Sequence, residues 1–265
     1  MKTKTLFRSF LLLCSFFCCS AAAQIAPKIE SYKAGESLLY EAKFSKTVLR
    51  GIEVAALSFT VESAPESRNF VVKTEAKPKG TLSGVFLPDF LQNYESTVDG
   101  RNFSILKTVK RDKQGDRVRD SAAIFDYKTR KVVYIETDPN NVARPPLNAA
   151  SPVESGMQDL VSALYTLRRL PLGVGKSFEL KVSDSGLVYT IPLRVIARVR
   201  QKSIFGNVWC FQVEAEVFGK NRLIEKEGNM ILWITDDARR LPVRSQINSS
   251  LGRIEVKLKQ ATTGK

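Results

Sequence analysis

The sequence predicts a mainly β protein: a long antiparallel sheet, strongly curved or partly closed (half-barrel-like), with one main α-helix packed on its concave face. Apolar and polar residues alternate with a period of two along most of the chain, which is typical of strands with one dry and one wet face. Turn sequences such as Asp99-Gly100 and Ser185-Gly186 separate these segments, and one segment changes to helical spacing. Because long twisted sheets tend to curl or close, we expect a curved sheet.

Five segments show the alternation most clearly, and they are 38–44, 70–76, 191–199, 209–217 and 254–258. Further strands are expected at 54–61, 93–98, 103–111, 117–127, 131–137, 177–183, 229–235 and 243–249. The runs Val132–Ile135 and Met230–Ile234 are apolar at consecutive positions, so we expect both of their faces to be covered.

The main helix is predicted over 157–169. Its apolar residues recur at a spacing of three and four, at Met157, Leu160, Val161, Leu164 and Tyr165. The segment 155–158 fits a capping box before the first turn, and Pro171 follows the expected end. A second, shorter helix or turn is expected at about 82–91.

Residues 138–156 are rich in proline and asparagine and are predicted to form a loop. The loop could link two halves of the chain. Because strands of the same style continue on both sides of it, we expect a single β-rich domain over residues 24–265.

The first 23 residues predict a signal peptide that is cleaved. A basic start with Lys2, Lys4 and Arg8 precedes an apolar run over 10–19, and 20–23 supplies the small residues that signal peptidase requires. The run is shorter than the roughly 20 residues that span a bilayer. Anchoring through a lipid-modified cysteine is a weaker alternative, because no small residue precedes Cys14 or Cys18. We therefore expect export, to the periplasm or beyond the cell.

Cleavage would leave 242 of the 265 residues, lower the formal charge from +14 to +11, and leave Cys210 as the one cysteine. The chain contains no histidine. These counts exclude Ser-His-Asp and Cys-His catalysis, histidine-ligated zinc and thiolate metal clusters. We predict no catalytic residue, no cofactor and no metal site.

The excess of positive charge has two interpretations. Side chains at Arg194, Arg198 and Arg200 are expected to project together from one strand, and those at Lys257 and Lys259 from another. They are hypothetical contacts for an anionic partner such as lipid headgroups or an acidic envelope polymer. Alternatively, they form a solvated face. The export signal disfavours nucleic acid as a partner.

Two other features could have either a structural or a catalytic role. The carboxylates of Asp236 and Asp237 could act as an acid and a base, but we favour a tight turn in which they are neutralised by Arg239 and Arg240. Cys210 is expected on a polar face that also carries carboxylates, which would raise its pKa and make it unreactive.

Three stretches together carry a family resemblance. They contain Gly35, Glu36 and Tyr40; then Asp159, Tyr165 and Arg168; then Trp233, Asp236, Asp237, Arg240, Pro242 and Arg244. With these motifs, the chain from about Tyr32 to Lys259 resembles DUF3108, an uncharacterised family of exported bacterial proteins. The resemblance assigns no role to any motif residue. The turn from Lys46 to Glu53 is more charged than the family pattern leads us to expect.

A looser, fold-level similarity is to the periplasmic lipoprotein-carrier proteins of the LolA/LolB type. Their export, their curved sheet with a helix in the concavity and a late strand near Leu-Pro-Val-Arg are similar to what this chain predicts. The similarity implies a concave face that accepts acyl chains, although a fold does not fix a function.

The leading hypothesis is therefore a non-enzymatic envelope protein that binds a hydrophobic or amphipathic, lipid-like ligand in its curved sheet. One alternative is a structural or interaction module that contacts anionic envelope polymers or membranes through its basic surface. A weaker alternative is a carboxylate-dependent hydrolase.

Overall fold

A computed structural model describes residues 33–64, 67–80 and 89–264. The predicted signal peptide lies outside the described residues, as does most of the predicted helix or turn at 82–91. The last two residues of that segment begin a strand, β4 (Phe90–Val98).

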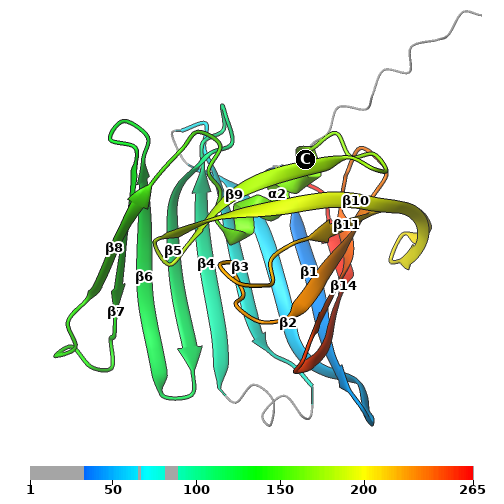
Figure 1. The fold of residues 1–265 in the computed structure, drawn as a ribbon, viewed down its shortest axis with the longest axis horizontal. Helices are drawn as coiled ribbons and strands as arrows, with labels where there is room; N and C mark the ends of the chain where they lie inside the picture. The colour runs from blue at the N-terminus through cyan, green and yellow to red at the C-terminus, as the bar shows by residue number, and fades with distance from the viewer. Residues whose placement is uncertain (1–32, 65–66, 81–88, 265) are drawn as a thin grey trace, which may run out of the picture.

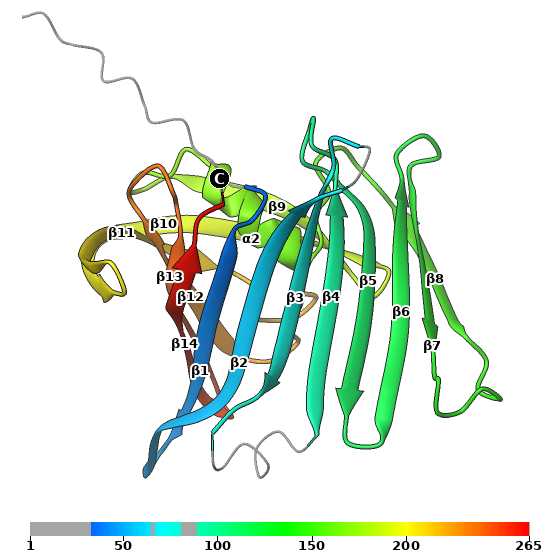
Figure 2. The ribbon, with the colours of Figure 1, turned by 180° about the vertical axis from the view of Figure 1, so that it is seen from behind.

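The described residues form one antiparallel sheet of fourteen strands (Figures 1 and 2). The strands are β1 (Ser37–Lys46), β2 (Leu49–Ser63), β3 (Phe70–Pro78), β4 (Phe90–Val98), β5 (Ile105–Gln114), β6 (Arg117–Asp126), β7 (Lys131–Thr137), β8 (Leu147–Pro152), β9 (Ser177–Asp184), β10 (Leu187–Ser203), β11 (Gly206–Ala215), β12 (Gly228–Thr235), β13 (Pro242–Ser249) and β14 (Gly252–Thr262).

Each strand pairs with the strands before and after it in the chain, except that β8 and β9 do not pair with each other and that β14 pairs with β1. The two free edges are therefore β8 and β9, and the sheet does not close into a barrel. Figure 1 shows the sheet bending so that β9 and β10 cross in front of the strands β1 to β5. The prediction of a mainly β fold with a strongly curved, partly closed sheet is confirmed.

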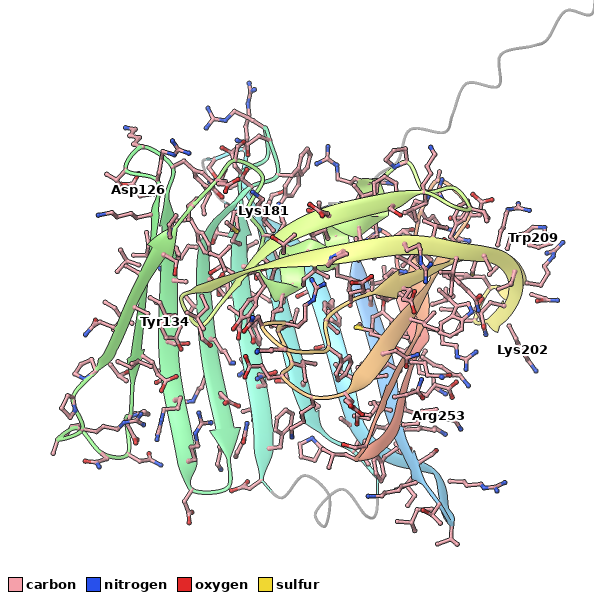
Figure 3. The ribbon with its side chains drawn as sticks, viewed as in Figure 1. Asp126, Tyr134, Lys181, Lys202, Trp209 and Arg253 are labelled. Atoms are coloured by element: carbon pink, nitrogen blue, oxygen red, sulfur yellow. The ribbon has the colours of Figure 1, made fainter. Side chains whose placement is uncertain are left out.

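The open side is bridged by the β9–β10 turn, which lies against β7 and β8. The Ser151 hydroxyl donates a hydrogen bond of 2.6 Å to the carbonyl of Gly186 in this turn. A Cβ atom on Gly186 would lie 2.7 Å from the Cβ of Tyr134, and the backbone φ of +79° also favours glycine. Figure 3 labels Tyr134 beside this turn.

The helix α2 (Leu160–Arg169) packs between the two halves of the curved sheet, on the concave face as predicted. Val161 and Tyr165 join one buried cluster with residues of β2 to β7, whereas Leu167 joins a second cluster built from β9 to β12. Both faces of a short helix thus bury apolar surface, and the helix connects the halves that the sheet leaves open.

The helix begins three residues later than predicted. Gln158 pairs with Val182 as an extended bridge, which keeps this segment out of the helix. The N-cap is Asp159: its carboxylate accepts hydrogen bonds from the backbone N–H groups of Val161 and Ser162, and the Ser162 hydroxyl accepts one from the N–H of Asp159. The capping box is therefore Asp159 with Ser162, and the box predicted at 155–158 is wrong.

All thirteen predicted strands are present, but the predicted loop at 138–156 is wrong in part because it contains β8. The core of β8, Asn148-Ala149-Ala150-Ser151, has no β-branched residue, so its sequence did not resemble a strand. As an edge strand it also tolerates the flanking prolines, whose missing N–H would interrupt a central strand.

A buried ion pair joins segments that are far apart in the sequence. The guanidinium of Arg168 in the last turn of α2 donates to both carboxylate oxygens of Glu36, at 2.7 and 2.8 Å, and to the carbonyl of Arg239, at 3.1 Å. The side chains of Arg168 and Glu36 are only 1% and 3% exposed. Burial alone would lower the pKa of Arg168, but the hydrogen bonds and charge of Glu36 raise it, so the guanidinium stays charged.

Replacement of Glu36 by Gln, or of Arg168 by Met, is expected to lower the free energy of unfolding by about 3–5 kcal/mol, because each leaves one buried charge without its partner. Urea denaturation measures the change. The control is Arg194→Met, which breaks an exposed pair with Glu214 and should cost less than about 1 kcal/mol. Equal effects of Glu36→Gln and Arg194→Met would contradict the assignment.

Candidate functional site

An apolar groove lies on the concave face, between α2 and the inner side of the sheet. It consists of two hollows of about 220 and 260 Å³, which share Leu57, Phe59, Leu164 and Met230. We call this continuous hollow the concave groove. Its other apolar lining residues are Tyr40, Ala76, Tyr94, Leu160, Val161, Leu232, Pro242, Ile247 and Val256.

The groove exists because the helix covers only part of the concave face. Beyond the buried clusters, the inward-facing side chains of Leu57, Phe59 and Met230 remain half-buried. Tyr40 packs edge-on against Phe59, with ring centroids 5.5 Å apart, and forms one wall. These half-buried side chains still expose apolar surface to water inside the concavity. A nonpolar ligand that bound there would cover this surface.

One side chain that lines the groove carries a buried polar atom without a hydrogen bond. Tyr40 is 5% exposed, and its hydroxyl has no hydrogen-bond partner within the described part of the chain. Burial raises the pKa of Tyr40, although the nearby charge of Arg168 opposes this, so the phenol is a neutral donor at physiological pH. Gln92 and Ser245 add polar groups to the lining.

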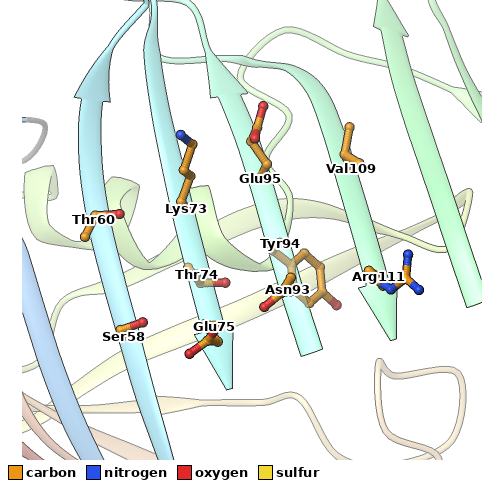
Figure 4. A pocket seen from close by; sticks show the side chains of 10 residues that line it. All are labelled: Ser58, Thr60, Lys73, Thr74, Glu75, Asn93, Tyr94, Glu95, Val109 and Arg111. Carbon is orange, nitrogen blue, oxygen red and sulfur yellow. The ribbon is translucent and has the colours of Figure 1, made fainter. Parts of the chain in front are cut away.

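A separate hollow, of about 360 Å³, lies outside the concave groove, on the outer face of β2 to β5 (Figure 4). Its side chains, such as Ser58, Lys73, Glu95 and Arg111, alternate with those that face the groove. Its charges are largely neutralised locally, since Lys73 pairs with Glu62 and Arg111 with Asp120. It has the open, mixed lining of a solvated sheet surface, so the concave groove is the better candidate site.

The predicted basic residues of β10 do not share one face. A β-bulge between Val195 and Ala197 reverses the alternation, so Arg194 projects on the side opposite Arg198 and Arg200. The latter two guanidinium groups stack on Trp209, at 4.3 and 4.7 Å from its ring centre. The expectation that all three project together is therefore wrong, and the cause is the extra residue at the bulge.

Most of the predicted anionic-partner contacts are already in ion pairs. Arg194 pairs with Glu214 and Arg198 with Asp236, each at 2.7 Å, and Lys257 pairs with Glu255 at 2.8 Å. Lys259 lies 3.4 Å from Glu41. Arg200 is the exception: no described carboxylate lies within 4 Å of its guanidinium, which donates instead to the carbonyl of Asn207.

The Asp236-Asp237 segment forms the tight turn that we favoured. Asp237 accepts hydrogen bonds from the Thr235 hydroxyl and from the backbone and side chain of Arg239. Asp236 pairs with Arg198 and, at 3.3 Å, with Arg240. Although burial opposes it, the bonds from Arg239 and Thr235 lower the pKa of Asp237. Both carboxylates therefore act as turn and ion-pair partners, and no described cluster of three metal-ligating side chains includes them.

Cys210 is fully buried, in an apolar cluster that also contains Trp233, Leu241 and Val243. Burial raises the pKa of the thiol to about 12, helped by the charges of Asp237 and Asp236. The direction agrees with the prediction. The cause differs, because the residue lies in an apolar cluster and not on a wet polar face.

The three family motifs meet around the buried pair. Gly35, with a φ of +83°, forms the turn that brings Glu36 to Arg168, and the third motif supplies the Arg239 carbonyl beside them. Of the other motif residues, Asp159 caps α2, Tyr165 is buried in the core beside the helix, and Tyr40 and Pro242 line the groove. The guanidinium of Arg244 lies 4.3 Å from the ring centre of Trp233.

The motifs did not identify most of the groove. Leu57, Phe59, Met230 and Ile247 lie outside the three motif stretches. The period-two pattern assigned such residues to the dry face, but it could not separate residues that fill the core from residues that line a hollow. That difference depends on how far α2 reaches over the sheet.

Comparisons with known proteins agree with this fold. The model of a family described as "Protein of unknown function (DUF3108)" matches residues 39–259. A β-barrel-like protein of a domain of unknown function, DUF1849, from Brucella abortus has a TM-score of 0.52 and 8% identity, over 88% of this chain and 98% of that one. Its similarity shows the fold alone. No curated protein matches the sequence.

Two further solved structures are more distant. One is described as an exported protein with a YmcC-like fold, from Bacteroides fragilis, with a TM-score of 0.35 and 11% identity over 90% of this chain and 100% of that one. The other is described as a lipoprotein from Parabacteroides distasonis, with a TM-score of 0.33 and 9% identity over 89% and 99%. Within the described residues, no helix has the length and apolar character needed to cross a membrane.

The Glu41 cluster predicts a pH dependence of stability. Burial opposes ionisation of Glu41, but the neighbouring ammonium groups of Lys43, Lys79 and Lys259 lower its pKa to about 2, against 4.5 for an ordinary Glu. This stabilisation is complete above pH 4.5 and is lost as the pH falls towards 2. Because the lysines are half-exposed, Glu41→Gln should cost about 1–2 kcal/mol at pH 7. Denaturation at several pH values should show that cost shrinking below pH 4.5; a constant cost would contradict it.

Cys210 should resist thiol reagents while the protein is folded. With a pKa of about 12, only on the order of one thiol in 10,000 is ionised at pH 8, and the side chain is fully covered. Its reaction with a chromogenic disulfide should be at least about 1,000-fold slower in buffer than in urea. Rapid labelling of the folded protein would contradict the burial of Cys210.

Proposed function

We propose a function for this chain, which belongs to the DUF3108 family of proteins of unknown function: it is an exported, non-enzymatic protein of the bacterial envelope that binds a lipid-like ligand. The ligand lies in the concave groove, with its nonpolar part between α2 and the inner face of the sheet.

The observation that carries the proposal is the exposed apolar surface inside a preformed concavity. Leu57 and Phe59 on β2 face Leu164 on the helix and Met230 on β12, and all four remain half-buried. Ligand sites of typical proteins have volumes of about 300–1,000 Å³, and each hollow alone is smaller than that. Because the two hollows share four lining residues, a single ligand could extend through both. Full burial of an exposed apolar side chain is favourable by about 1.5–3 kcal/mol, and covering these half-buried side chains would contribute roughly a third of that each.

Polar groups in the lining support an amphipathic ligand over a pure hydrocarbon. Gln92 and Ser245 lie among the apolar lining residues, and either side chain could donate a hydrogen bond to a ligand oxygen. A fatty acid, an alcohol or the ester of a glycerolipid has such an oxygen beside an alkyl chain.

The second candidate function is an interaction module that contacts an anionic polymer through its basic surface. Arg200 favours it, because its guanidinium is without a described carboxylate and stacks on Trp209, a half-exposed ring. The other four predicted contacts already have carboxylate partners, which makes this the weaker proposal.

Purification under native conditions tests the leading function. Native mass spectrometry is expected to show lipid bound to the protein, and the variant Leu57→Asp should bind at least about tenfold less of a fluorescent fatty acid, because a carboxylate replaces apolar groove surface.

The matched control is Ser58→Asp. It introduces the same charge one position along β2, where the side chain projects to the outer face, so binding should remain that of the parent. Equal losses in the two variants, or no lipid and no probe bound by the folded parent, would refute a groove site.

A further inference from the structure

Two adjacent hairpins end together at one rim of the sheet. The β1–β2 turn lies beside the β13–β14 turn because β1 pairs with β14, with Ser45 opposite Arg253. In Figures 1 and 2 the β1–β2 hairpin, drawn in blue, projects past the lower rim of the sheet. We call these two turns the hairpin tip and define it as residues 45–51 and 249–253.

The tip exposes aliphatic side chains that have no core to join. Val48 is 86% exposed, Leu251 60% and Leu49 40%. A turn in water needs none of them, since polar residues and glycine satisfy its backbone equally well. Three neighbouring aliphatic residues at the most protruding point expose apolar surface to water, which is energetically unfavourable.

The same tip carries positive charge without compensation. Lys46, Arg50 and Arg253 line an open hollow of about 420 Å³, whose lining contains no carboxylate. Within the described residues, no Asp or Glu oxygen lies within 4 Å of the charged nitrogen atoms of these three side chains. This distinguishes them from the cations of β14, where Lys257 and Lys259 each have a carboxylate partner.

We propose that the hairpin tip docks the protein on a bilayer that contains anionic phospholipid. Aliphatic side chains next to Lys and Arg match the two layers of a membrane surface: Val48, Leu49 and Leu251 enter the boundary between headgroups and acyl chains, while the cations lie at the phosphates. A soluble anionic polymer would use the charges and leave the aliphatic residues in water, which is why a lipid surface fits the tip better.

The docking goes beyond ligand binding in the groove and does not require it. The two features are nevertheless adjacent, because the groove residues Ile247 and Val256 lie on β13 and β14 a few residues from the tip. A docked protein would hold this end of the groove close to the membrane surface.

Vesicle co-sedimentation of the purified protein tests the docking. The parent should bind vesicles of mixed phosphatidylcholine and phosphatidylglycerol, bind phosphatidylcholine alone weakly, and release at high salt. Each cation near an anionic surface contributes about fivefold, so Lys46→Gln, Arg50→Gln and Arg253→Gln combined should weaken binding on the order of 100-fold. Val48→Asp should weaken it about tenfold.

Two controls separate the tip from general effects. Val142→Asp alters another exposed valine, 92% exposed, in the loop before β8, and Lys128→Gln removes an exposed cation at the β6–β7 turn. Both should bind vesicles as the parent does. The docking is wrong if the parent does not bind anionic vesicles, if the combined tip variant binds unchanged, or if Val142→Asp is as harmful as Val48→Asp.

A third arm separates lipid from soluble anion and from the groove. Heparin in solution should bind a Val48→Asn variant, which leaves the charge of the tip unchanged, as tightly as it binds the parent, whereas anionic vesicles should bind this variant more weakly than the parent. If Val48→Asn weakens the binding of heparin and of vesicles equally, the tip is a polyanion site and the membrane assignment is overturned. The combined tip variant should still bind a fluorescent fatty acid, so failure of docking and failure of the groove give different results.

Discussion

The buried pair between Glu36 and Arg168 is the interaction on which the rest of the structure depends. It connects the start of β1, the end of α2 and the carbonyl of Arg239 after β12. A bidentate ion pair out of water is stable only if its geometry is satisfied, so the three segments can meet in one arrangement. Each of the three motif stretches supplies one partner of this junction: Glu36, Arg168 and the carbonyl of Arg239.

The junction decides where the helix lies, and the helix decides where the groove is. Asp159 fixes the other end of α2, because its carboxylate accepts from two backbone N–H groups and from the hydroxyls of Ser96 and Thr108, at 2.5 and 2.7 Å. With both ends held, a helix of ten residues covers the upper part of the concave face and leaves Leu57, Phe59 and Met230 uncovered. The site is thus a consequence of a short helix on a long curved sheet.

Period-two alternation was enough to predict the sheet, since a half-buried strand repeats its apolar residues at every second position. It failed where local geometry changes the repeat: the bulge between Val195 and Ala197 moved Arg194 to the other face, and β8 has too little apolar character to show the pattern. The helix start was misplaced because Ser155 and Gln158 matched a capping box that the bridge between Gln158 and Val182 prevents. The groove and the hairpin tip are formed by segments that are distant in the sequence. The periodicity within one segment does not predict which other segments lie beside it.

Hydrogen exchange of α2 tests the central claim most directly. The amides of Leu160–Arg169 would be compared between the parent protein and Glu36→Gln, with the central strands β3 to β6 as the internal reference. If the buried pair holds the helix over the sheet, exchange in α2 should become at least about tenfold faster in the variant while the reference strands change little. Unchanged protection of α2 in a variant shown to lack the pair would contradict the account.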